Sequence, residues 1–477
     1  MTERPHRLWT FLASSLALFM VVLDNLVVTT ALPVIRTDLG ASLESLEWTV
    51  NAYTLTFAVF LLTGAALGDR FGRRRMFALG IVVFTLASAG AALAPDAGTL
   101  VAFRAIQGLG GAMVMPLTLT ILSAAFPAEK RGAAIGAWSG ISGLAVAIGP
   151  LVGGAVVEGI SWQWIFWLNV PIGIALVPVI LGRLSESFGP AKQLDLRGLA
   201  LGSLGLFGIV YGVVQGNAHG WAAGDVLGGM VGGLALLAGF VAWELRAPHP
   251  MLPLRFFRNR AFTATNLVSL AMYFGMFGAI FLLAQFFQTA QGYSPLEAGL
   301  RTLPWTAMPM LIAPIAGVLA ERIGSRPLLV SGLALQAAGL AWIAAVSTPS
   351  LGYASLVGPF VLSGIGMSLV FPAIATSILG AVRPEEEGQA SGANNAIREL
   401  GGVLGIAVLA AVFASYGGYE SPQAFNDGLV PAVWIGAIVV ALGALAGLAV
   451  PGIRAVRAAR AALERERVAA PVADPVG

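Results

Sequence analysis

The sequence predicts an all-α protein that crosses a membrane fourteen times. Of the 477 residues, 57% are hydrophobic and only 11% are charged, whereas soluble domains carry about 25% charged residues. Apolar runs of bilayer-spanning length recur along the chain, and basic residues gather on alternate connections between them. So few charged side chains cannot cover a soluble surface, which excludes a soluble enzyme, a DNA-binding protein and a disordered scaffold.

Fourteen apolar runs lie between charged or Pro/Gly-rich breaks, each near the roughly 20 residues that a helix needs to cross the bilayer core. The predicted spans are 9–33, 48–67, 76–94, 99–122, 133–157, 163–182, 196–216, 222–244, 261–287, 298–320, 327–346, 352–379, 389–415 and 429–450. The first run is too long for a signal peptide, carries Asp24 and lacks a small-residue cleavage site. We therefore expect it to remain as a helix.

The basic residues predict the orientation of these spans. With a cytoplasmic N-terminus, 23 of the 27 Lys and Arg residues fall on cytoplasmic segments, and only Arg36 and Arg301 fall outside. An even number of spans with both termini in the cytoplasm follows, in the cell membrane. The basic pI of about 9.4 then reflects topology and attraction to anionic lipid rather than a nucleic-acid partner.

The chain offers little to hold a metal or a cofactor. It has no cysteine, which excludes disulfides, thiol nucleophiles and thiolate metal sites. Its three histidines, His6, His219 and His249, fall in terminal or loop stretches. No metal and no cofactor are expected, and a membrane-embedded enzyme is disfavoured because no histidine lies within a span.

An internal repeat divides the chain into related halves. Residues 65–74 after the second span and 317–326 after the tenth share Leu, acid, Arg, Gly and Arg at a constant offset of 252 positions. Repeated halves are typical of secondary transporters, whose binding site lies between them. The predicted units are a six-helix bundle (1–186), an inserted helix pair formed by spans 7 and 8 (187–250), a second six-helix bundle (251–453) and a basic cytoplasmic tail (454–477).

The repeated loops have two interpretations. A glycine allows a tight turn, and an acid at the helix end can pair with arginines. The loops are then either turns that fix topology or a cytoplasmic latch whose ion pairs break as the halves rock. The latch candidates are Asp69, Arg70, Arg73, Arg74, Glu321, Arg322 and Arg326.

These loops resemble the signature G-x-L-A-D-R-x-G-R-R/K of the major facilitator superfamily. Residues 104–112 resemble its R-x-x-Q-G-x-G-x-A motif. The stretch 149–154 is similar to G-P-x-x-G-G, which is associated with antiporters and comprises Gly149, Pro150, Gly153 and Gly154. The resemblance implies a major facilitator fold with fourteen transmembrane helices, arranged as 6+2+6 with pseudo-two-fold halves.

Two further stretches, 23–33 and 162–173, are similar to motifs of the fourteen-helix drug:proton antiporters of the EmrB/QacA type. The resemblance implies a proton-coupled exporter of hydrophobic or cationic small molecules, a multidrug efflux protein of the antibiotic-resistance kind that works by alternating access. The alternative is a major facilitator permease or exporter for one metabolite, such as an antibiotic, an amino acid or another small solute.

Energy for transport is expected from an ion gradient. No G-x-x-x-x-G-K-S/T loop exists in the sequence, so ATP is not expected to drive the cycle. The expected partners are a lipophilic or cationic small molecule, protons and membrane lipids, and the protein is expected to be a monomer.

Charged side chains within the spans are the candidate proton carriers, since each is costly in the bilayer core. Desolvation disfavours the Asp24 carboxylate, so Asp24 could take a proton on one side of the membrane and release it on the other, in competition with a cationic substrate. Alternatively, Asp24 is a structural acid permanently paired with Arg104. Arg104 either tunes a nearby acid or pairs structurally. Glu399 is the second candidate carrier, or else a partner for a basic group.

A polar stripe on the thirteenth span completes the predicted cavity. Helical spacing places Asn394 with Arg398 on one face and Asn395 with Glu399 on another. Because neighbours on a helix point about 100° apart, Arg398 and Glu399 are not expected to pair. Glu158 is expected at a helix end near the membrane surface. The candidate cavity residues are Asn25, Tyr53, Gln107, Asn394, Asn395 and Arg398.

Overall fold

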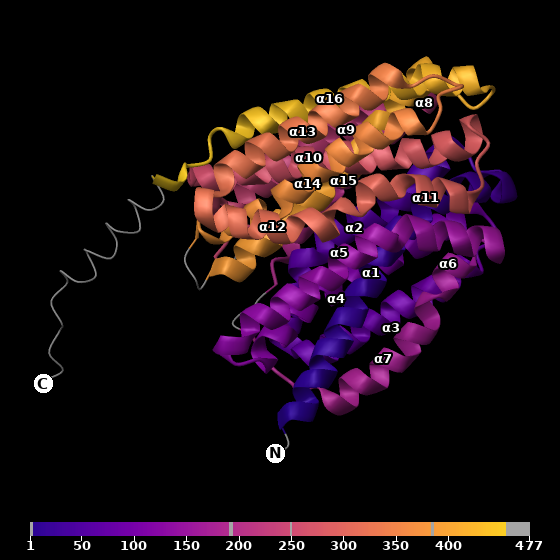
Figure 1. Cartoon of the computed structure of the whole chain (residues 1–477). Helices are drawn as coiled ribbons and strands as arrows, with labels where there is room; N and C mark the ends of the chain where they lie inside the picture. Colours follow the sequence, from indigo (N-terminus) through magenta and orange to yellow (C-terminus); the bar gives the residue numbers. More distant parts are fainter. Residues whose placement is uncertain (1–2, 190–193, 249, 383–385, 455–477) are drawn as a thin grey trace, which may run out of the picture.

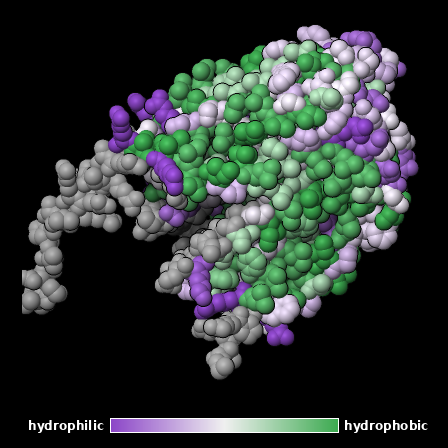
Figure 2. Space-filling view, viewed as in Figure 1, coloured by the Kyte–Doolittle hydropathy of each residue, from purple (hydrophilic) through white to green (hydrophobic). Residues whose placement is uncertain are grey.

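The computed structural model describes residues 3–189, 194–248, 250–382 and 386–454, and these contain helices and no strands. Fourteen segments are long and apolar enough to cross a membrane, which confirms the predicted number of spans. Figure 2 shows hydrophobic residues spread broadly over the sides of both lobes, with the hydrophilic ones gathered mostly at the two ends. The fold is that of a multi-pass membrane protein. The predicted basic tail after residue 454 lies outside the described residues.

The first seven helices form one bundle, drawn in indigo to magenta in Figure 1. They are α1 (Glu3–Leu39), α2 (Leu43–Phe71), α3 (Arg73–Ala92), α4 (Ala97–Ala125), α5 (Ala128–Gly159), α6 (Trp164–Trp167) and α7 (Asn169–Arg183). The sixth predicted span is thus broken into a single turn, α6, and a longer helix, α7.

The second bundle and the inserted pair follow. The pair consists of α8 (Leu196–His219) and α9 (Gly224–Glu244), which pack against each other. A short 3-10 helix, η1 (Leu254–Arg258), leads into the second bundle. Its helices are α10 (Arg260–Gln285), the π-helical turn η2 (Phe286–Ala290), α11 (Pro295–Thr306), α12 (Met308–Ile323), α13 (Ser325–Val346), α14 (Ala354–Leu379), α15 (Glu387–Tyr416) and α16 (Pro422–Gly447).

Side-chain caps begin several of the helices where the sequence places Ser or Asp. At the start of α4, Asp96 accepts hydrogen bonds from the Thr99 amide at 2.8 Å and from the Thr99 hydroxyl at 2.9 Å. These bonds lower the pKa of the Asp96 carboxyl. Ser294 forms a capping box with Glu297 at the start of α11. These caps satisfy backbone amides at the helix starts and so fix where these helices begin.

Two turn glycines give the repeat a structural meaning. Gly72 joins α2 to α3 with φ of 105°, and Gly324 joins α12 to α13 with φ of 88°. This region is open to glycine but costly for other residues. The two positions are separated by the repeat offset of the sequence, so both copies of the loop make the same kind of turn. The boundaries of the four predicted units stay a prediction.

The bundles meet along two pairs of helices that the repeat relates to each other. The second span, α2, packs against the thirteenth, α15, and the fifth, α5, packs against the tenth, at α11. Exchange of the two halves converts one pair into the other. Helix α8 of the inserted pair contacts both α2 and α15, so it lies over one of these seams.

We call the end at which α1 begins and α16 ends the terminal end, on the left in Figure 1, and the opposite end the distal end. At the distal end the bundles touch through small residues. A Cβ atom on Gly154 would lie 2.8 Å from the Leu296 Cα, and one on Gly299 would lie 2.9 Å from the Pro150 carbonyl carbon. Helices α5 and α11 can approach this closely only because both positions lack a side chain.

Polar contacts fasten the distal end. Glu158, exposed at the end of α5 as expected, accepts a hydrogen bond from the Leu296 amide at 3.0 Å. Gln288 donates to the Thr30 carbonyl at 2.8 Å. The Arg36 guanidinium lies 3.4 Å from the centre of the Tyr419 ring.

Tyr419 belongs to the connection between α15 and α16, and its hydroxyl donates to the Gln285 side chain at 2.5 Å. Burial raises the pKa of this phenol, and the neighbouring Arg36 charge opposes that rise. The ring therefore stays neutral under the cation, and the distal end is closed by contacts between the two bundles.

Replacement of Gly154 by valine is expected to part the distal contact, because the added atoms would collide with the α11 backbone. Since the chain has no cysteine, spin labels on Ile160→Cys and Leu300→Cys, both at exposed positions, would report this cleanly. Electron paramagnetic resonance should show longer distances in Gly154→Val than in the native background.

The matched control is Gly143→Val, on the same helix, where an added Cβ meets nothing within 4 Å. Equal distance distributions for both valine variants would contradict the assignment of Gly154 to the closure.

Candidate functional site

A buried acid in α1 is the centre of a hydrogen-bonded network. Asp24 is 1% exposed and forms an ion pair with Arg104 of α4, at 2.6 Å between Oδ2 and Nη1. Its other oxygen, Oδ1, accepts from Gln107 at 2.8 Å and from Asn169 of α7 at 2.7 Å. Side chains from two other helices thus satisfy the carboxylate, as a charge within a membrane span requires.

Arg104 is itself held from several sides. It is fully buried; its Nε donates to the Thr49 carbonyl at 3.0 Å, and its Nη1 also donates to Gln107 at 2.7 Å. The guanidinium carbon lies 4.2 Å from the centre of the Tyr53 ring. One nitrogen, Nη2, has no hydrogen-bond partner. Because arginine stays charged, the pair fits both roles considered from the sequence, the structural one and the tuning of an acid.

Asn169 was missed by the sequence analysis as a site residue. It shares the Ser88 hydroxyl with Gln107, at 3.3 Å and 2.8 Å respectively. The signal was present, since Asn169 lies in a hydrophobic span two residues before Pro171 and within a stretch quoted for its family resemblance. A buried amide in such a place needs polar partners.

The second bundle carries its own buried acid. Glu399 of α15 is 5% exposed, and its Oε1 lies 3.5 Å from the Arg398 guanidinium. The expectation that these neighbours do not pair is therefore wrong. The long Arg398 side chain turns along the helix and lies over the Tyr273 ring, 4.8 Å from its centre. The other Glu399 oxygen, Oε2, has no hydrogen-bond partner.

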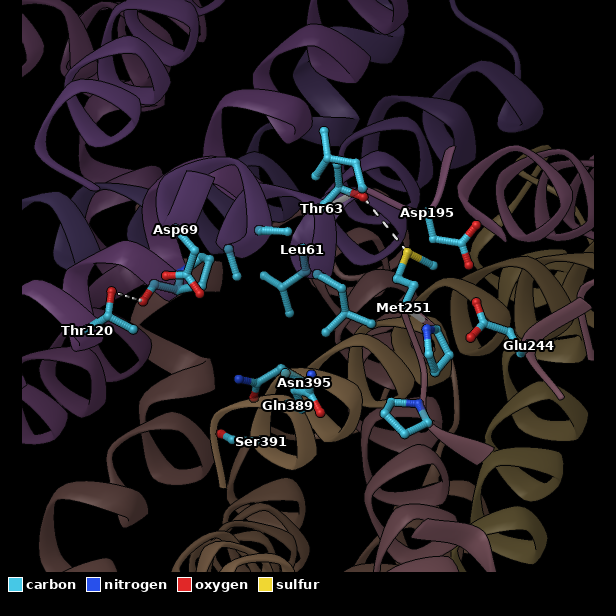
Figure 3. A pocket seen from close by; sticks show the side chains of 18 of the residues that line it. Leu61, Thr63, Asp69, Thr120, Asp195, Glu244, Met251, Gln389, Ser391 and Asn395 are labelled. Atoms are coloured by element: carbon cyan, nitrogen blue, oxygen red, sulfur yellow. Dashed lines mark hydrogen bonds between the residues drawn. The ribbon is translucent and has the colours of Figure 1, made fainter. Parts of the chain in front are cut away.

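A cavity of about 1200 Å³ opens between the bundles on the terminal side. Figure 3 shows side chains from α2, α4, α15 and the segment between α9 and α10 around it. Much of the wall is apolar, with Leu61, Leu62, Met115 and Met251, and drug-sized ligands occupy sites of about 300–1,000 Å³ with linings of this kind. Its polar groups include Thr63, Thr120, Gln389, Ser391 and Asn395.

Only Asn395 among the six predicted cavity residues lines this cavity. Asn394 instead donates to Asn266 at 3.0 Å and to Ser269 at 2.9 Å within the second bundle. Gln107 belongs to the Asp24 network. The Tyr53 hydroxyl donates to the Val21 carbonyl at 3.3 Å.

Two more members of that set lie elsewhere. The Oδ1 of Asn25 is buried without a hydrogen-bond partner, and Arg398 pairs with Glu399. The predicted role of all six in contacting cargo stays a prediction.

The predicted latch makes its described contacts within one bundle. Asp69 pairs with Arg73 at 2.8 Å, and Arg74 donates through its amide to Glu186, just beyond α7, at 2.8 Å. Arg70 is exposed, with its guanidinium 5.0 Å from the centre of the Phe71 ring. In this conformation the first loop therefore ties α2 and α3 to the segment after α7.

The second copy of the latch is less fully described. Arg322 and Arg326 are exposed near the turn between α12 and α13. The Glu321 side chain lies outside the described residues.

The glycine motif in α5 lies between the buried acid and the distal closure. A Cβ on Gly149 would lie 2.8 Å from the Leu26 Cβ, and one on Gly153 would lie 2.8 Å from the Val27 carbonyl. Both contacts are to α1, close to Asp24. With Gly154 and Pro150 against α11, the motif couples the helix that carries the acid to the other bundle.

Glu47 and Asn51 are buried polar residues of α2 that the sequence analysis did not list. Glu47 is 2% exposed with no hydrogen-bond partner for Oε2, and neither amide atom of Asn51 has one. The predicted second span began at residue 48, whereas α2 begins at Leu43. Glu47 was therefore assigned to a loop, although it lies within the helix.

Comparison with known proteins identifies relatives of the whole chain. A family model described as Major Facilitator Superfamily matches residues 14–405 and 265–473. The tetracenomycin C resistance and export protein of Streptomyces glaucescens is 36% identical over 427 residues, which are 89% of this chain and 79% of the relative. The puromycin resistance protein of Streptomyces alboniger is 36% identical over 92% of this chain and 90% of its own.

Similar folds occur among solved structures. A bacterial homologue of the human lysosomal transporter Spinster matches with a TM-score of 0.65 at 18% identity, covering 93% of this chain and 96% of that one. The xylose transporter XylE of E. coli matches with a TM-score of 0.62 at 14% identity, covering 94% and 99%. At these identities the likeness concerns the fold alone.

Loss of Arg104 is expected to destabilise the protein strongly, because Arg104→Leu leaves the Asp24 carboxylate buried without a counter-charge. Breaking such a pair costs about 3–5 kcal/mol. Addition of Asp24→Asn to Arg104→Leu should recover part of the loss. Thermal unfolding in detergent would measure all three proteins.

Arg75→Leu is the control, since Arg75 is exposed and forms only a 3.5 Å surface pair with Glu186, worth at most about 1 kcal/mol. An Arg104→Leu protein as stable as Arg75→Leu would refute the structural importance of the buried pair.

Proposed function

Since the chain belongs to the Major Facilitator Superfamily and is therefore a transporter rather than an enzyme, we propose that it exports hydrophobic or cationic small molecules in exchange for protons. We place it in the fourteen-helix branch of drug:proton antiporters, in the cell membrane with both termini in the cytoplasm. It works as a monomer surrounded by lipid. The terminal end, where the cavity opens, then faces the cytoplasm, and the distal closure faces outward.

One observation carries the proposal: a fully buried, ionisable carboxyl, Asp24, held by Arg104 beside the helix that contacts the other bundle. A proton added to Asp24 removes the charge that Arg104 neutralises. Arg104 must then find other acceptors, and the packing of α1 against α4 and α5 changes. Protonation in this way acts on the contact that closes the distal end.

Competition for the carboxyl gives exchange. Asp24 can be neutralised by Arg104, by a proton or by a cationic cargo that displaces the arginine, and these states exclude one another. Cargo that enters from the cytoplasm would favour the deprotonated acid. A proton that arrives from outside would then neutralise the acid and release the cargo. Exchange of one proton for one monovalent cation moves no net charge, so the pH gradient drives it. The membrane potential would contribute only where net charge crosses, at about 2.3 kcal/mol per charge per 100 mV.

Glu399 offers a second carrier on the opposite bundle. It lies on α15, which packs against α2. A proton site on each side of the seam allows both bundles to respond when cargo enters between them. We nevertheless propose Asp24 as the main carrier, because its helix, α1, packs against α5, which also contacts the other bundle at the distal closure.

Export is supported by the names of the relatives. One is a resistance and export protein, and the Multidrug resistance protein Stp of Mycobacterium tuberculosis is 35% identical over 86% of this chain. The apolar cavity wall fits lipophilic cargo. Two relatives are named for single antibiotics, tetracenomycin C and puromycin, which favours a second candidate, an exporter of one compound. Competition among unrelated lipophilic cations would separate the two.

The proposal is tested with purified protein in liposomes under an imposed proton gradient. The native chain should move ethidium against its concentration gradient, and Asp24→Asn should abolish the movement, because the asparagine cannot titrate. Glu399→Gln should reduce the rate without abolishing it.

Asp96→Asn serves as the control, since Asp96 is an exposed helix cap and asparagine caps helices equally well. Gradient-driven accumulation retained in Asp24→Asn would contradict the role of this acid. Movement of neutral compounds alone would contradict the cationic cargo.

A further inference from the structure

The inserted pair α8–α9 brings two carboxyl groups to the cavity wall. Asp195 directly precedes α8 and Glu244 is the last residue of α9, and both line the cavity between the bundles. A Cβ atom on Gly198 would lie 2.6 Å from the Asp195 Oδ2 and 2.6 Å from the Glu244 Oε1. Figure 3 shows the two carboxyl groups beside Met251. The Asp195 Oδ2 and Glu244 Oε1 atoms are therefore both within reach of one small charged group.

The other two oxygens of this pair, Asp195 Oδ1 and Glu244 Oε2, already have donors. Asp195 Oδ1 accepts from the Gly198 amide at 2.8 Å and from the Trp243 indole at 2.8 Å, and the same indole also donates to Asp195 Oδ2 at 3.1 Å. Glu244 Oε2 accepts from the Leu252 amide at 3.1 Å. Glu244 is only 4% exposed, yet its Oε1 has no donor. A buried carboxylate oxygen aimed at a second carboxylate requires a positive charge or a proton.

No arginine among the described residues forms an ion pair with Asp195 or Glu244. Arg73 of the cavity wall pairs with Asp69, and Arg255 pairs with Glu386 at 2.6 Å. Arg258 also lines the cavity but forms no ion pair with either acid in the described part of the chain. Arg197 of α8 lies with its guanidinium 5.0 Å from the centre of the Trp243 ring. Among the described residues, the carboxyl pair at the mouth of the cavity therefore has no arginine partner.

The surroundings of the pair suit an amphiphilic cation. Besides Met251, whose sulfur lies 3.8 Å from the Thr63 hydroxyl across the seam, the neighbouring cavity lining consists largely of leucine and proline side chains. A cation could place its charge between the carboxyl groups and its apolar body along this wall. Helix α8 itself contacts both bundles, so the inserted pair presents the charge at the seam through which cargo reaches the cavity.

We propose that Asp195 and Glu244 form a binding site for the charged group of an organic cation, where cargo from the cytoplasm binds before it reaches Asp24. This proposal rests on the proposed export function and gives the inserted helices a role in it. Selectivity for cations would then begin before the cargo approaches Asp24.

The test uses a double variant that carries both Asp195→Asn and Glu244→Gln. Its transport and binding are compared with those of the native chain. Asparagine keeps the cap of α8, and glutamine keeps an acceptor for the Leu252 amide, so the fold should persist. In liposomes, the KM for ethidium should rise about tenfold, as expected for the loss of a charged contact, while the maximal rate stays within about twofold. Equilibrium binding of ethidium to the purified protein should weaken by a similar factor.

The matched control is Asp225→Asn, which removes a carboxylate at the other end of the inserted pair, where Asp225 contacts His219 at 2.5 Å in an exposed position. This variant should keep the native KM. An unchanged KM in the double variant, or an equal change in the control, would overturn the proposal.

Three further outcomes would also overturn it. A fall in maximal rate at unchanged KM would make the pair structural. A shifted pH profile without a change in ethidium binding would make it a site for a shared proton. An effect confined to liposomes that contain phosphatidylethanolamine would assign it to a lipid ammonium group. Failure of the export function itself is distinguishable, because the native chain would then bind ethidium without moving it.

Discussion

The ion pair between Asp24 and Arg104 constrains the packing of the whole first bundle. Charges near the membrane centre cost several kcal/mol, so α1, α4 and α7 must bring their polar side chains to one point. The backbone of α2 also takes part, through the Thr49 carbonyl. This convergence needs helices in near contact. A Cβ on Gly108 of α4 would lie 3.0 Å from the Tyr53 carbonyl carbon of α2, so a larger residue there would push Arg104 away from its acceptor.

The same constraint extends to the other bundle through α5. Gly149 and Gly153 place α5 on α1, while Gly154 places it on α11, so a single helix touches both the acid-bearing helix and the opposite half. The repeat supplies a second seam of the same kind, between α2 and α15, which carries Glu399. Closed contacts at the distal end and a cavity at the terminal end are therefore two aspects of one arrangement. In the proposed mechanism, a change in the charge of Asp24 would act on α1, the helix against which α5 packs.

Local patterns predicted much of this arrangement. Apolar run length identified all fourteen spans, and the repeat placed Gly72 and Gly324 in equivalent turns. Side-chain partners across the bundle were harder to predict, because they depend on how helices rotate and approach. Asn169 of α7 contacts Asp24 of α1 because the two helices approach each other at this point. Asn394 points into its own bundle, where it contacts Asn266 and Ser269, rather than into the predicted cavity. The pairing of Arg398 with Glu399 shows that a long side chain can overcome the angular separation of helical neighbours. Glu47 was not recognised as a buried acid because the predicted span began at residue 48, a few residues after the true start of the helix at Leu43.

The proposed exchange depends on competition between cargo and a proton for Asp24. Proton release on binding tests this most directly, with purified protein in detergent, a weak buffer and a pH-sensitive dye. Addition of ethidium should release protons from the native chain when the solution is acidic enough for Asp24 to be protonated, and none from Asp24→Asn. Ethidium binding by the native chain without any proton release, or equal release from the variant, would contradict the exchange mechanism.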